Sequence, residues 1–355
     1  MTQTPVVSVL VACTRPELIE GIARSLAADA GSVPYELLVA GDVAGLGAGL
    51  DPDRWPAPTT LIDCDTIQLN LMRRLMASRA RGQVIAFLDD DAVPQPGWLS
   101  VAATLPPDST EVWTGPERPT RSTPGALLAA EIGASVLAEG YRGHVGVGDH
   151  PVRWYEAPFC NLVVGRELLE RVGLPDPQMV WDLDDFDFCR RAALHGATFR
   201  TRDDLCILHD RYPADTREWL ARKARERRRT GEKLIRYPSI YLRIPSVVVA
   251  ATAPWALVGL AALTVRRRRA LLVPFGLAYA TAVAAEALRN GRRGRRATEF
   301  ALGMVALHVV STAALQLGIG IGVGSRLIRR ADPNLPTGAT GRVTAVSGDR
   351  RRCRA

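Results

Sequence analysis

The stretch QVIAFLDDDAV (residues 83–93) decides the fold class of this chain of 355 residues. Its first part, 83–88, is a largely apolar run that is typical of a buried strand. Three aspartates, Asp89 to Asp91, follow at once. Adjacent carboxylates repel one another, which costs stability unless a cation or hydrogen-bond donors offset the charge. The stretch therefore predicts a buried strand that leads directly into an acidic turn.

The segments before this stretch alternate between strand-like and helix-like patterns. They are a strand at 6–11, a helix at 16–28, a strand at 35–40 and a helix at 67–80. This alternation predicts an α/β fold with a mainly parallel, Rossmann-like sheet that has helices on both faces. Ligands of such sheets bind beyond the carboxyl ends of the strands. Because Thr14, Asp42 and Asp89 to Asp91 all lie at such ends, we expect a ligand site at this edge.

The acidic turn is the candidate metal site. Mg²⁺ and Mn²⁺ take oxygen ligands, commonly one or two carboxylates together with substrate phosphates. Arg73, on the helix expected at 67–80, is a candidate partner for phosphate. Asp42 is a candidate acceptor for hydrogen bonds from a nucleotide base or ribose. The alternatives that stay open are structural: an acidic loop, a solvated arginine and ordinary turn chemistry.

A second candidate group lies in the following part of the chain. It consists of a helix at 166–172, an acidic cluster at 182–187, a helix at 186–194 and a strand at 205–208. A carboxylate such as Asp185 is suited to take a proton from an acceptor hydroxyl as a general base. His209, which follows the last strand, is a candidate third metal ligand. Acids also stabilise a helix start through its dipole, and a lone histidine is often structural, so these alternatives remain.

The C-terminal part predicts a membrane region. We expect the α/β domain to cover 1–215, followed by a basic juxtamembrane helix at 216–243, a membrane region at 244–325 and a disordered basic tail at 326–355. The membrane region contains three apolar segments, at 244–265, 270–288 and 300–323. Each is close to the roughly 20 residues that span a bilayer. We therefore expect up to three membrane helices, with buried core helices as the alternative.

The distribution of basic residues predicts the orientation of these segments. Nine Lys or Arg lie at 222–243 and five at 289–296, which makes fourteen on one side of three spans. Seven lie on the other side, at 266–269 and 326–330. Since basic residues concentrate on the cytoplasmic side, we expect a multi-pass protein of the cell membrane whose α/β domain is cytoplasmic.

Charge and cysteine spacing argue against a nucleic-acid partner and against a zinc site. The net charge of +8 is compatible with a polyanion, but the arginine clusters flank apolar segments and lack interleaved aromatic residues, which argues against nucleic acid. The six cysteines include no CxxC pair and no zinc-like spacing with histidine. The partners that remain are a phosphate-bearing small molecule and an anionic membrane surface.

Taken together, these motifs resemble those of glycosyltransferase family 2, the inverting nucleotide-sugar transferases with a GT-A fold. The opening VSVLVACTRPELIEGIARSL (7–26) looks like the first strand and turn of that family. The passage MRRLMASRARGQVIAFLDDDAVPQPGWL (72–99) is similar to its most typical stretch, and NLVVGRELLERVGLPD (161–176) resembles its acceptor-side segment. The resemblance covers about residues 6–215.

The resemblance implies a role for each matching residue. The donor-binding residues it implies are Thr14, Arg15, Asp42, Arg73, Asp89 and Asp90. The metal ligands it implies are Asp91, Asp89 and His209, for Mg²⁺ or Mn²⁺. The acceptor-side residues it implies are Asn161, Trp181 and Arg191. Asp185 matches the general base, and Asp184 precedes it in the catalytic pair.

The resemblance and the apolar segments together imply a membrane-bound enzyme. We expect it to move a sugar, with inversion, from a nucleotide-diphosphate donor to a hydroxyl or phosphate acceptor. The expected acceptor is a lipid-linked or polysaccharide glycan of the cell envelope, delivered at the bilayer. The alternative is a non-catalytic, membrane-anchored protein that keeps the fold and binds nucleotides or glycans; the presence of both Asp91 and Asp185 argues against it.

Overall fold

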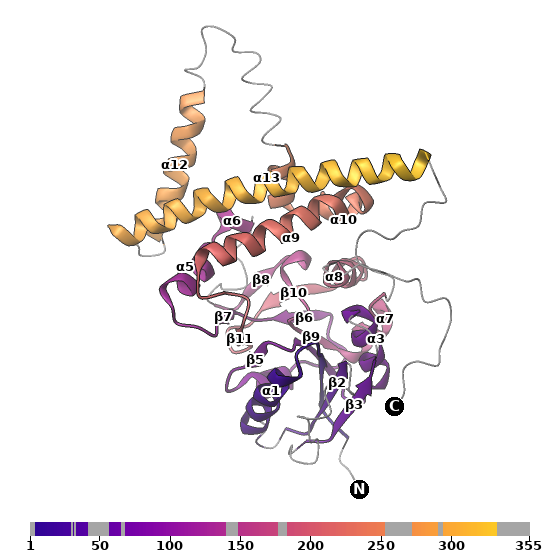
Figure 1. Cartoon of the computed structure of the whole chain (residues 1–355). Helices are drawn as coiled ribbons and strands as arrows, with labels where there is room; N and C mark the ends of the chain where they lie inside the picture. The colour runs from indigo at the N-terminus through magenta and orange to yellow at the C-terminus, as the bar shows by residue number, and fades with distance from the viewer. Residues whose placement is uncertain are drawn as a thin grey trace. The chain divides into compact units, whose positions relative to one another are not determined.

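The structure, a computed structural model, divides the chain into two compact units (Figure 1). It describes residues 4–29, 31, 33–41, 57–64, 68–139, 148–176, 183–252, 272–289 and 294–331. One unit holds the described residues up to Thr120 and those from 148 to Arg211. The other unit consists of the described residues that begin at Arg121 and end at Glu139, together with those from Tyr212 onward. Contacts thus divide the chain at Arg121 and again at Tyr212, and the predicted domain bounds stay a prediction.

The first unit is built on a sheet of eight strands in the order β3-β2-β1-β4-β9-β6-β10-β8. In that order the strands are Thr59–Asp63, Tyr35–Gly41, Val7–Ala12, Val84–Asp89, Asn161–Gly165, Glu111–Thr114, Thr198–Thr201 and His150–Val152. The first four are mutually parallel, whereas β9 runs antiparallel to both β4 and β6. The predicted α/β class with a mainly parallel sheet is confirmed, and the antiparallel strand makes the sheet mixed.

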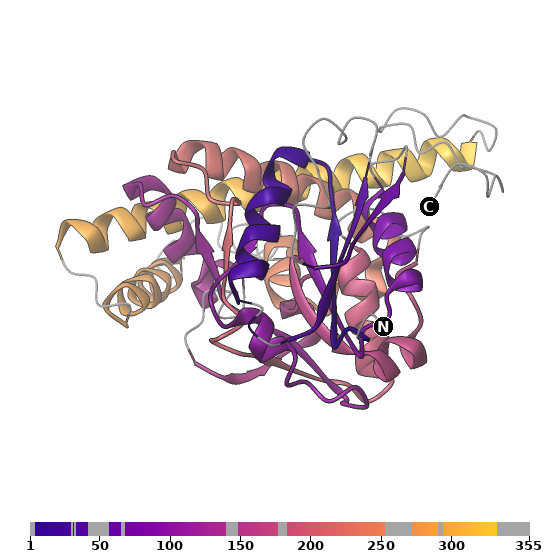
Figure 2. The same ribbon diagram turned by 90° about the horizontal axis from the view of Figure 1, so that it is seen from below.

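Helices cover both faces of this sheet, as Figure 2 shows for the indigo helix α1 and the purple helix α3. Strand β1 explains why two cores form, because successive side chains of a strand point to opposite faces. Val7, Val9 and Val11 pack into the core under α1 (Pro16–Asp29) and α4 (Trp98–Ala102). Leu10 and Ala12 pack into the core under α3 (Leu69–Arg79), α7 (Arg166–Val172) and α8 (Asp184–Leu194). Burying one such Val or Leu side chain contributes about 1.5–3 kcal/mol.

A second, three-stranded sheet has the order β5-β11-β7, with strands Ala92–Pro94, Ile207–His209 and Glu117–Pro119. Its central strand pairs antiparallel with β5, and the register sets His209 opposite Ala92. His209 is therefore the last residue of the strand, where the sequence predicts it just beyond one. This pairing brings a residue from late in the chain next to the acidic turn that follows β4.

Most predicted elements agree with the structure to within two residues, while several short strands are absent from the prediction. Among them are β3, at Thr59–Asp63, and β5, β6, β7 and β8, which have three or four residues each. Strands this short show no periodicity of their own. They form because neighbouring strands supply the hydrogen-bond partners, a condition that arises only in the folded chain.

The second unit is helical. Its helices are α5 (Pro124–Gly133), α6 (Val136–Glu139), α9 (Thr216–Arg236), α10 (Pro238–Tyr241), α12 (Leu272–Arg289) and α13 (Arg295–Ala331), and residues 245–252 are also helical. Trp219 on α9 is buried with Phe300, Met304 and Leu307 of α13 and with Val283 of α12. The basic helix expected after the α/β domain is α9.

Among the described residues, one helix is long and apolar enough to cross a membrane, the part of α13 from Arg295 to Leu327. The first predicted apolar segment is described only up to residue 252, and the predicted tail beyond residue 331 lies outside the described residues. The structure thus supports an apolar C-terminal helix, which is weak evidence for membrane association.

Two glycines bring α9 and α13 into backbone contact. A Cβ atom added to Gly318 would lie 1.9 Å from the carbonyl oxygen of Arg228, and one added to Gly231 would lie 2.2 Å from the carbonyl oxygen of Leu315. Real Cβ contacts do not come this close, so glycine is needed at both positions. The two helices are therefore packed as closely as their backbones allow.

We predict that Gly318→Ala lowers the free energy of unfolding of the detergent-solubilised protein. Overpacking costs about 1–3 kcal/mol, which outweighs the gain of about 1 kcal/mol that alanine brings to a helix interior. Gly320→Ala is the matched control, because no atom lies within 4 Å of a Cβ atom added to Gly320. Thermal unfolding should show a loss for the first variant and none for the second; equal stability of the two would contradict close packing.

Candidate functional site

The acidic turn lies where two parallel strands end side by side. β1 and β4 are paired so that Ala12 is opposite Asp89, the last residue of β4. Thr14 and Arg15 follow β1 and lead into α1, while Asp90 and Asp91 connect β4 to β5. The carboxyl ends of β1 and β4 thus deliver all of these polar groups to one edge of the sheet, as the sequence predicts.

Asp90 fastens the two strand ends together. Its Oδ2 accepts hydrogen bonds from the backbone N–H of Thr14 at 2.7 Å, the hydroxyl of Thr14 at 2.9 Å and the backbone N–H of Arg15 at 2.8 Å. Its Oδ1 lies 2.5 Å from Nη2 of Arg15. Asp90 is 3% exposed. These contacts occupy both of its oxygens, so the structure gives Asp90 and Thr14 the role of holding the turn; donor contact by either stays a prediction.

Asp91 is paired with two cations. Its Oδ2 lies 2.8 Å from Nη2 of Arg15, and its Oδ1 lies 3.1 Å from Nε2 of His209. Burial by itself raises the pKa of Asp91, but the hydrogen bond and charge of His209, together with Arg15, hold that pKa well below its usual range. Asp91 is therefore charged, and the side chain of Arg15, which is 41% exposed, is the cation that solvent reaches.

His209 is held from its other side by Glu117, a residue that the sequence does not single out. Nδ1 of His209 lies 2.7 Å from Oε2 of Glu117, which is fully buried and also pairs with Arg211 at 3.1 Å. Burial by itself lowers the pKa of His209, but the charge of Glu117 and the hydrogen bond to Asp91 raise it well above its ordinary value. Glu117 thereby orients the imidazole so that Nε2 points at Asp91, the arrangement that orients histidine ligands of metals.

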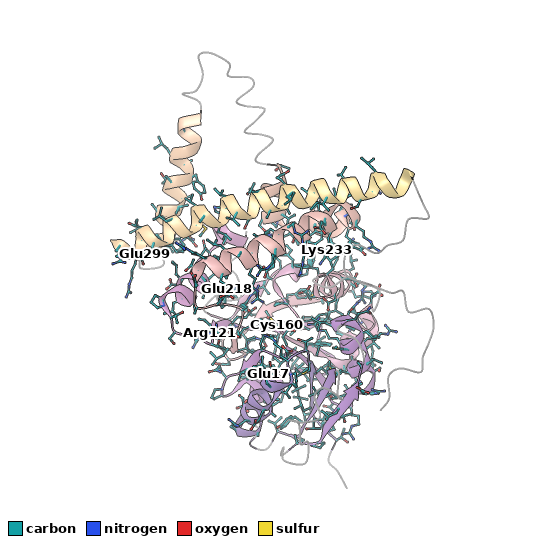
Figure 3. All side chains as sticks on the ribbon, viewed as in Figure 1. Glu17, Arg121, Cys160, Glu218, Lys233 and Glu299 are labelled. Carbon is teal, nitrogen blue, oxygen red and sulfur yellow. The ribbon has the colours of Figure 1, made fainter. Side chains whose placement is uncertain are left out.

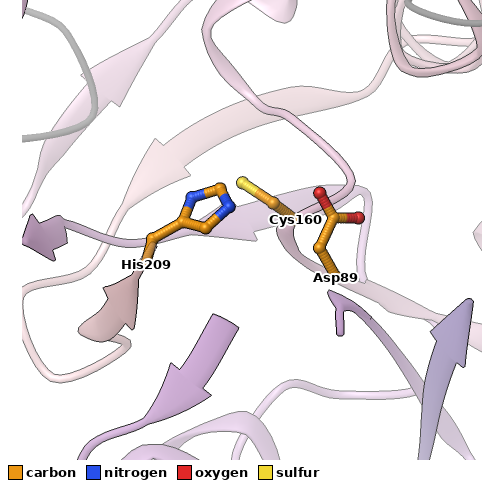
Figure 4. A group of neighbouring side chains, drawn as sticks. All are labelled: Asp89, Cys160 and His209. Carbon is orange, nitrogen blue, oxygen red and sulfur yellow. The ribbon is translucent and has the colours of Figure 1, made fainter. Parts of the chain in front are cut away.

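Cys160 is the second residue that sequence reasoning misses. It precedes β9, and the pairing of Leu88 with Asn161 continues outward so that Cys160 comes beside Asp89. One ligand atom from each of Asp89, Cys160 and His209 lies within 4.8 Å of the other two, and Figure 4 shows the sulfur between the imidazole and the carboxylate. Its thiol donates to Glu117 at 3.4 Å, and burial, followed by the charge of Glu117, raises its pKa.

Arg73 links the acidic turn to the start of α8. One terminal nitrogen donates to Asp89 at 2.7 Å and the other to Asp184, and the guanidinium carbon lies 4.9 Å from the ring centre of Phe159. Arg73 is 4% exposed. Desolvation raises the pKa of Asp89, against the opposing effect of the Arg73 charge. Both terminal nitrogens thus have carboxylate partners, so Arg73 positions Asp89 and Asp184, and its predicted contact with phosphate stays a prediction.

Asp185 lies beside this ion pair in the first turn of α8. It is half-buried, and its Oδ1 accepts a hydrogen bond from the backbone N–H of Phe186 at 2.7 Å. Its charge, after those of Asp184 and Asp89, helps to raise the pKa of Arg73. Asp184 is buried against Arg73, so Asp185 is the more accessible carboxylate of the pair.

Two predicted acceptor-side residues are engaged in the scaffold. Asn161 is fully buried; its amide oxygen accepts from the indole of Trp98 and its NH₂ donates to the carbonyl of Leu205. Arg191 pairs with Asp187 and donates to carbonyl groups at the end of α7. Acceptor contact by either residue stays a prediction. The third predicted acceptor-side residue, Trp181, and the predicted donor-binding residue Asp42 lie outside the described residues.

The residues at this edge fit a divalent cation. Carboxylates of Asp89 and Asp91 and the imidazole of His209 come together, and the repulsion between the acids is offset only in part by Arg15 and Arg73. An ion between Asp91 and His209 would replace their mutual contact with two coordinate bonds. Carboxylate oxygens suit Mg²⁺ and Mn²⁺, so both ions that the sequence predicts stay predictions.

Comparison with known proteins adds a likeness at the level of structure. No family model matches the chain, and no curated protein matches it. A crystal structure of S. aureus TarS 1-349 has 16% sequence identity to it and a TM-score of 0.41, covering 62% of this chain and 65% of that one. GalNAc-T7 with UDP, GalNAc and Mn²⁺ has 11% identity and a TM-score of 0.41, covering 61% and 47%.

A third solved structure, S. aureus TarS 1-349 in complex with UDP-GlcNAc, has 15% identity and a TM-score of 0.39, and covers 57% of each chain. The chain therefore spans less than two thirds of the length of each of these structures. Likeness at these values assigns no family to the chain, so its function is inferred from the site.

We predict that Asp90→Asn destabilises the protein even without any ligand. The change removes the negative charge that faces two backbone N–H groups and Arg15, and hydrogen bonds to a charged group contribute about 1.5–3 kcal/mol each. We expect a loss of about 2–3 kcal/mol in the free energy of unfolding in urea. Asp108→Asn, at an exposed aspartate of the same unit, should change it by less than about 0.5 kcal/mol. Similar values for both would rule out the anchoring role.

Proposed function

We propose that this chain is a membrane-associated glycosyltransferase that moves a sugar from a nucleotide-diphosphate donor, with a divalent cation bound at the acidic turn. The observation that supports this most is the convergence of Asp89, Asp91 and His209 at the carboxyl ends of β4 and β11. Ligands of α/β sheets bind at this edge. Carboxylates and a histidine at this edge are suited to bind a divalent cation that also binds the phosphate groups of a substrate.

The donor half of the site consists of the acidic turn and Arg15. Asp91, Asp89 and His209 are the proposed metal ligands, with Mn²⁺ or Mg²⁺ as the ion. When bound, the ion would neutralise the negative charge of the diphosphate leaving group. Arg15 is the partly exposed cation next to Asp91, and we propose that it faces the phosphates. Glu117 keeps Nε2 of His209 directed at the turn.

The acceptor half is proposed to begin at Asp185. A carboxylate next to a buried ion pair is suited to accept a proton from a hydroxyl as that hydroxyl attacks the sugar. Arg73 and Asp184 hold the start of α8 in place through their ion pair. Attack on the anomeric carbon from the face opposite the diphosphate inverts its configuration, which agrees with the reaction that the resemblance to glycosyltransferase family 2 implies.

The helical unit is proposed to anchor the enzyme at the cell membrane with its α/β domain in the cytoplasm. The basic residues next to the apolar segments support this orientation. An acceptor that the membrane itself presents, such as a lipid-linked or polysaccharide glycan of the cell envelope, would reach an enzyme held there.

A non-catalytic protein that binds nucleotides or glycans is the alternative. It would need the donor half of the site but not a carboxylate placed for proton transfer. A screen of nucleotide sugars with Mn²⁺, with membrane extract as acceptor, separates the two. Metal-dependent turnover of one donor supports the enzyme, and donor binding without turnover supports the alternative.

We predict that Asp185→Asn abolishes sugar transfer and leaves donor binding nearly unchanged. An amide cannot take the proton of the acceptor hydroxyl, whereas the metal ligands and Arg15 remain in place. Transfer should be followed with the donor found in the screen, and donor binding by calorimetry. Asp204→Asn, an exposed aspartate of the same unit, is the control and should keep its activity. Unchanged turnover in Asp185→Asn would remove Asp185 from the role of base.

We predict that Asp91→Ala abolishes the metal-dependent part of nucleotide-diphosphate binding. Without this carboxylate the proposed ion loses the ligand that faces His209, and we expect affinity in the presence of Mn²⁺ to fall more than about tenfold. Calorimetry with a nucleoside diphosphate, with Mn²⁺ and with a chelator, measures that difference. A variant that binds equally well with Mn²⁺ would contradict the assignment of Asp91 as a ligand.

A further inference from the structure

Helix α13 runs beside α9 along the whole length of α9. At the beginning of both helices, Trp219 of α9 is buried with Phe300 and Met304 of α13. Further on, Gly231 of α9 meets the backbone of α13 at Leu315, and Gly322 of α13 meets α9 at Glu232. Since contacts advance in step along both chains, the helices run in the same direction and lie side by side (Figure 1).

Helix α9 cannot lie in the hydrocarbon core of a membrane. Its 21 residues, TREWLARKARERRRTGEKLIR, include nine basic and three acidic side chains. Charged side chains project from it near its start, at Glu218, and near its end, at Lys233 (Figure 3). Each charge at the centre of a bilayer costs at least about 2.5–3.5 kcal/mol. A helix that is packed against α9 along its length therefore cannot be surrounded by the hydrocarbon core of the membrane, because its α9-facing side stays next to these charges.

We propose that α13 does not cross the membrane but lies in the plane of its interface, as a pair with α9, with one apolar face in the cytoplasmic leaflet. α13 has 37 residues, about 55 Å at 1.5 Å per residue, which exceeds the roughly 30 Å of hydrocarbon that a span needs to cross. This inference rests on the proposed membrane association and is independent of the transfer reaction.

The side of α13 away from α9 carries an apolar stripe that the described residues leave uncovered. Phe300, Met304, Leu307 and Leu315 face inward and are at most 3% exposed. The exposed residues recur at spacings of three, four and eight, which places them on one face of a helix. They are Leu302, Val305, Val309, Leu317 and Ile321, between 37% and 66% exposed. An apolar stripe of this kind suits the boundary between headgroups and acyl chains.

Charge and helix direction point to a lipid leaflet as the occupant of this face. Arg295, whose side chain is 92% exposed and pairs with Glu299, and the exposed Arg326, which donates to the carbonyl of Ile235 on α9, lie near the two ends of the stripe. With α13 in the plane of the interface, both guanidinium groups would lie at the depth of anionic headgroups. In Figure 1 the beginning of α12 extends beyond α13, away from α9, while Val283 and Ala287 nearer its end are buried in the cluster that contains Trp219 of α9. An in-plane α13 would thus direct the mostly exposed, apolar α12 toward the hydrocarbon.

The distribution of basic residues also fits an in-plane α13 better than a third span. With three spans, fourteen Lys or Arg lie on the cytoplasmic side and seven outside. With α13 in the interface, the three at 326–330 return to the cytoplasmic side, which gives seventeen against four. The bias that sets orientation is then stronger, and the four that remain outside are those at 266–269.

Cysteine accessibility in the full-length protein tests this inference. In a Cys353→Ser background, where the other five cysteines are buried, single reporters are placed by Arg217→Cys, Thr298→Cys and Ser325→Cys, all at exposed positions. A membrane-impermeant maleimide is applied to intact cells and to permeabilised cells. We expect all three reporters to react only after permeabilisation. Reaction of Ser325→Cys in intact cells, with Arg217→Cys protected, would show a span and overturn the inference.

A second experiment measures how deep α13 lies in the bilayer. It also shows whether the protein is bound to the membrane. A fluorescent label on Leu302→Cys, Val309→Cys or Leu317→Cys is exposed to lipids with bromine near the headgroup or deep in the acyl chain. We expect all three labels to be quenched best by the shallow bromine. The inference would be overturned if the label at 309 alone were quenched best by the deep bromine, or if no label were quenched. Neither measurement uses sugar transfer, so failure here is distinct from failure of the proposed reaction.

Discussion

The hydrogen bonds that Asp90 accepts from Thr14 and Arg15 are the interaction on which the site depends. They join the end of β1 to the end of β4 across 76 positions of sequence. A buried carboxylate that faces two backbone N–H groups and a guanidinium is stabilised by groups that cannot move away from it. Because Asp90 is held in this way, Asp89 and Asp91 on either side of it are directed to fixed places, one toward Arg73 and the other toward His209.

The charges around the turn are offset in part by two arginines, each shared between two acids. Arg15 lies between Asp90 and Asp91, and Arg73 lies between Asp89 and Asp184. His209 and Arg15 hold the pKa of Asp91 below its usual range, whereas desolvation raises the pKa of Asp89 in spite of Arg73. The same arrangement leaves the acids ready to exchange part of their pairing for a divalent ion, which is the property that the proposed function requires.

In the helical unit, two glycines fix the positions of neighbouring elements, as Asp90 does in the α/β unit. Gly318 and Gly231 allow the backbones of α13 and α9 to touch, and contact along that line determines which face of α13 is left exposed. An apolar helix has no preferred face of its own, because hydrophobic residues surround it. In the proposed in-plane arrangement, the polar helix α9 decides which face of the apolar helix α13 meets the membrane, and composition alone does not.

The sequence by itself determined the features that depend on neighbouring residues: the alternation of strands and helices, the apolar strand that ends in Asp89, Asp90 and Asp91, the basic helix α9 and the apolar length of α13. Only the tertiary structure decided which aspartate anchors the turn, that Arg73 is paired with Asp184, and that Glu117 and Cys160 belong to the site. The physical reason is distance along the chain. His209 meets Asp91 across 118 positions of sequence, and such a contact exists only after β11 has paired with β5, a choice that no local pattern around either residue encodes.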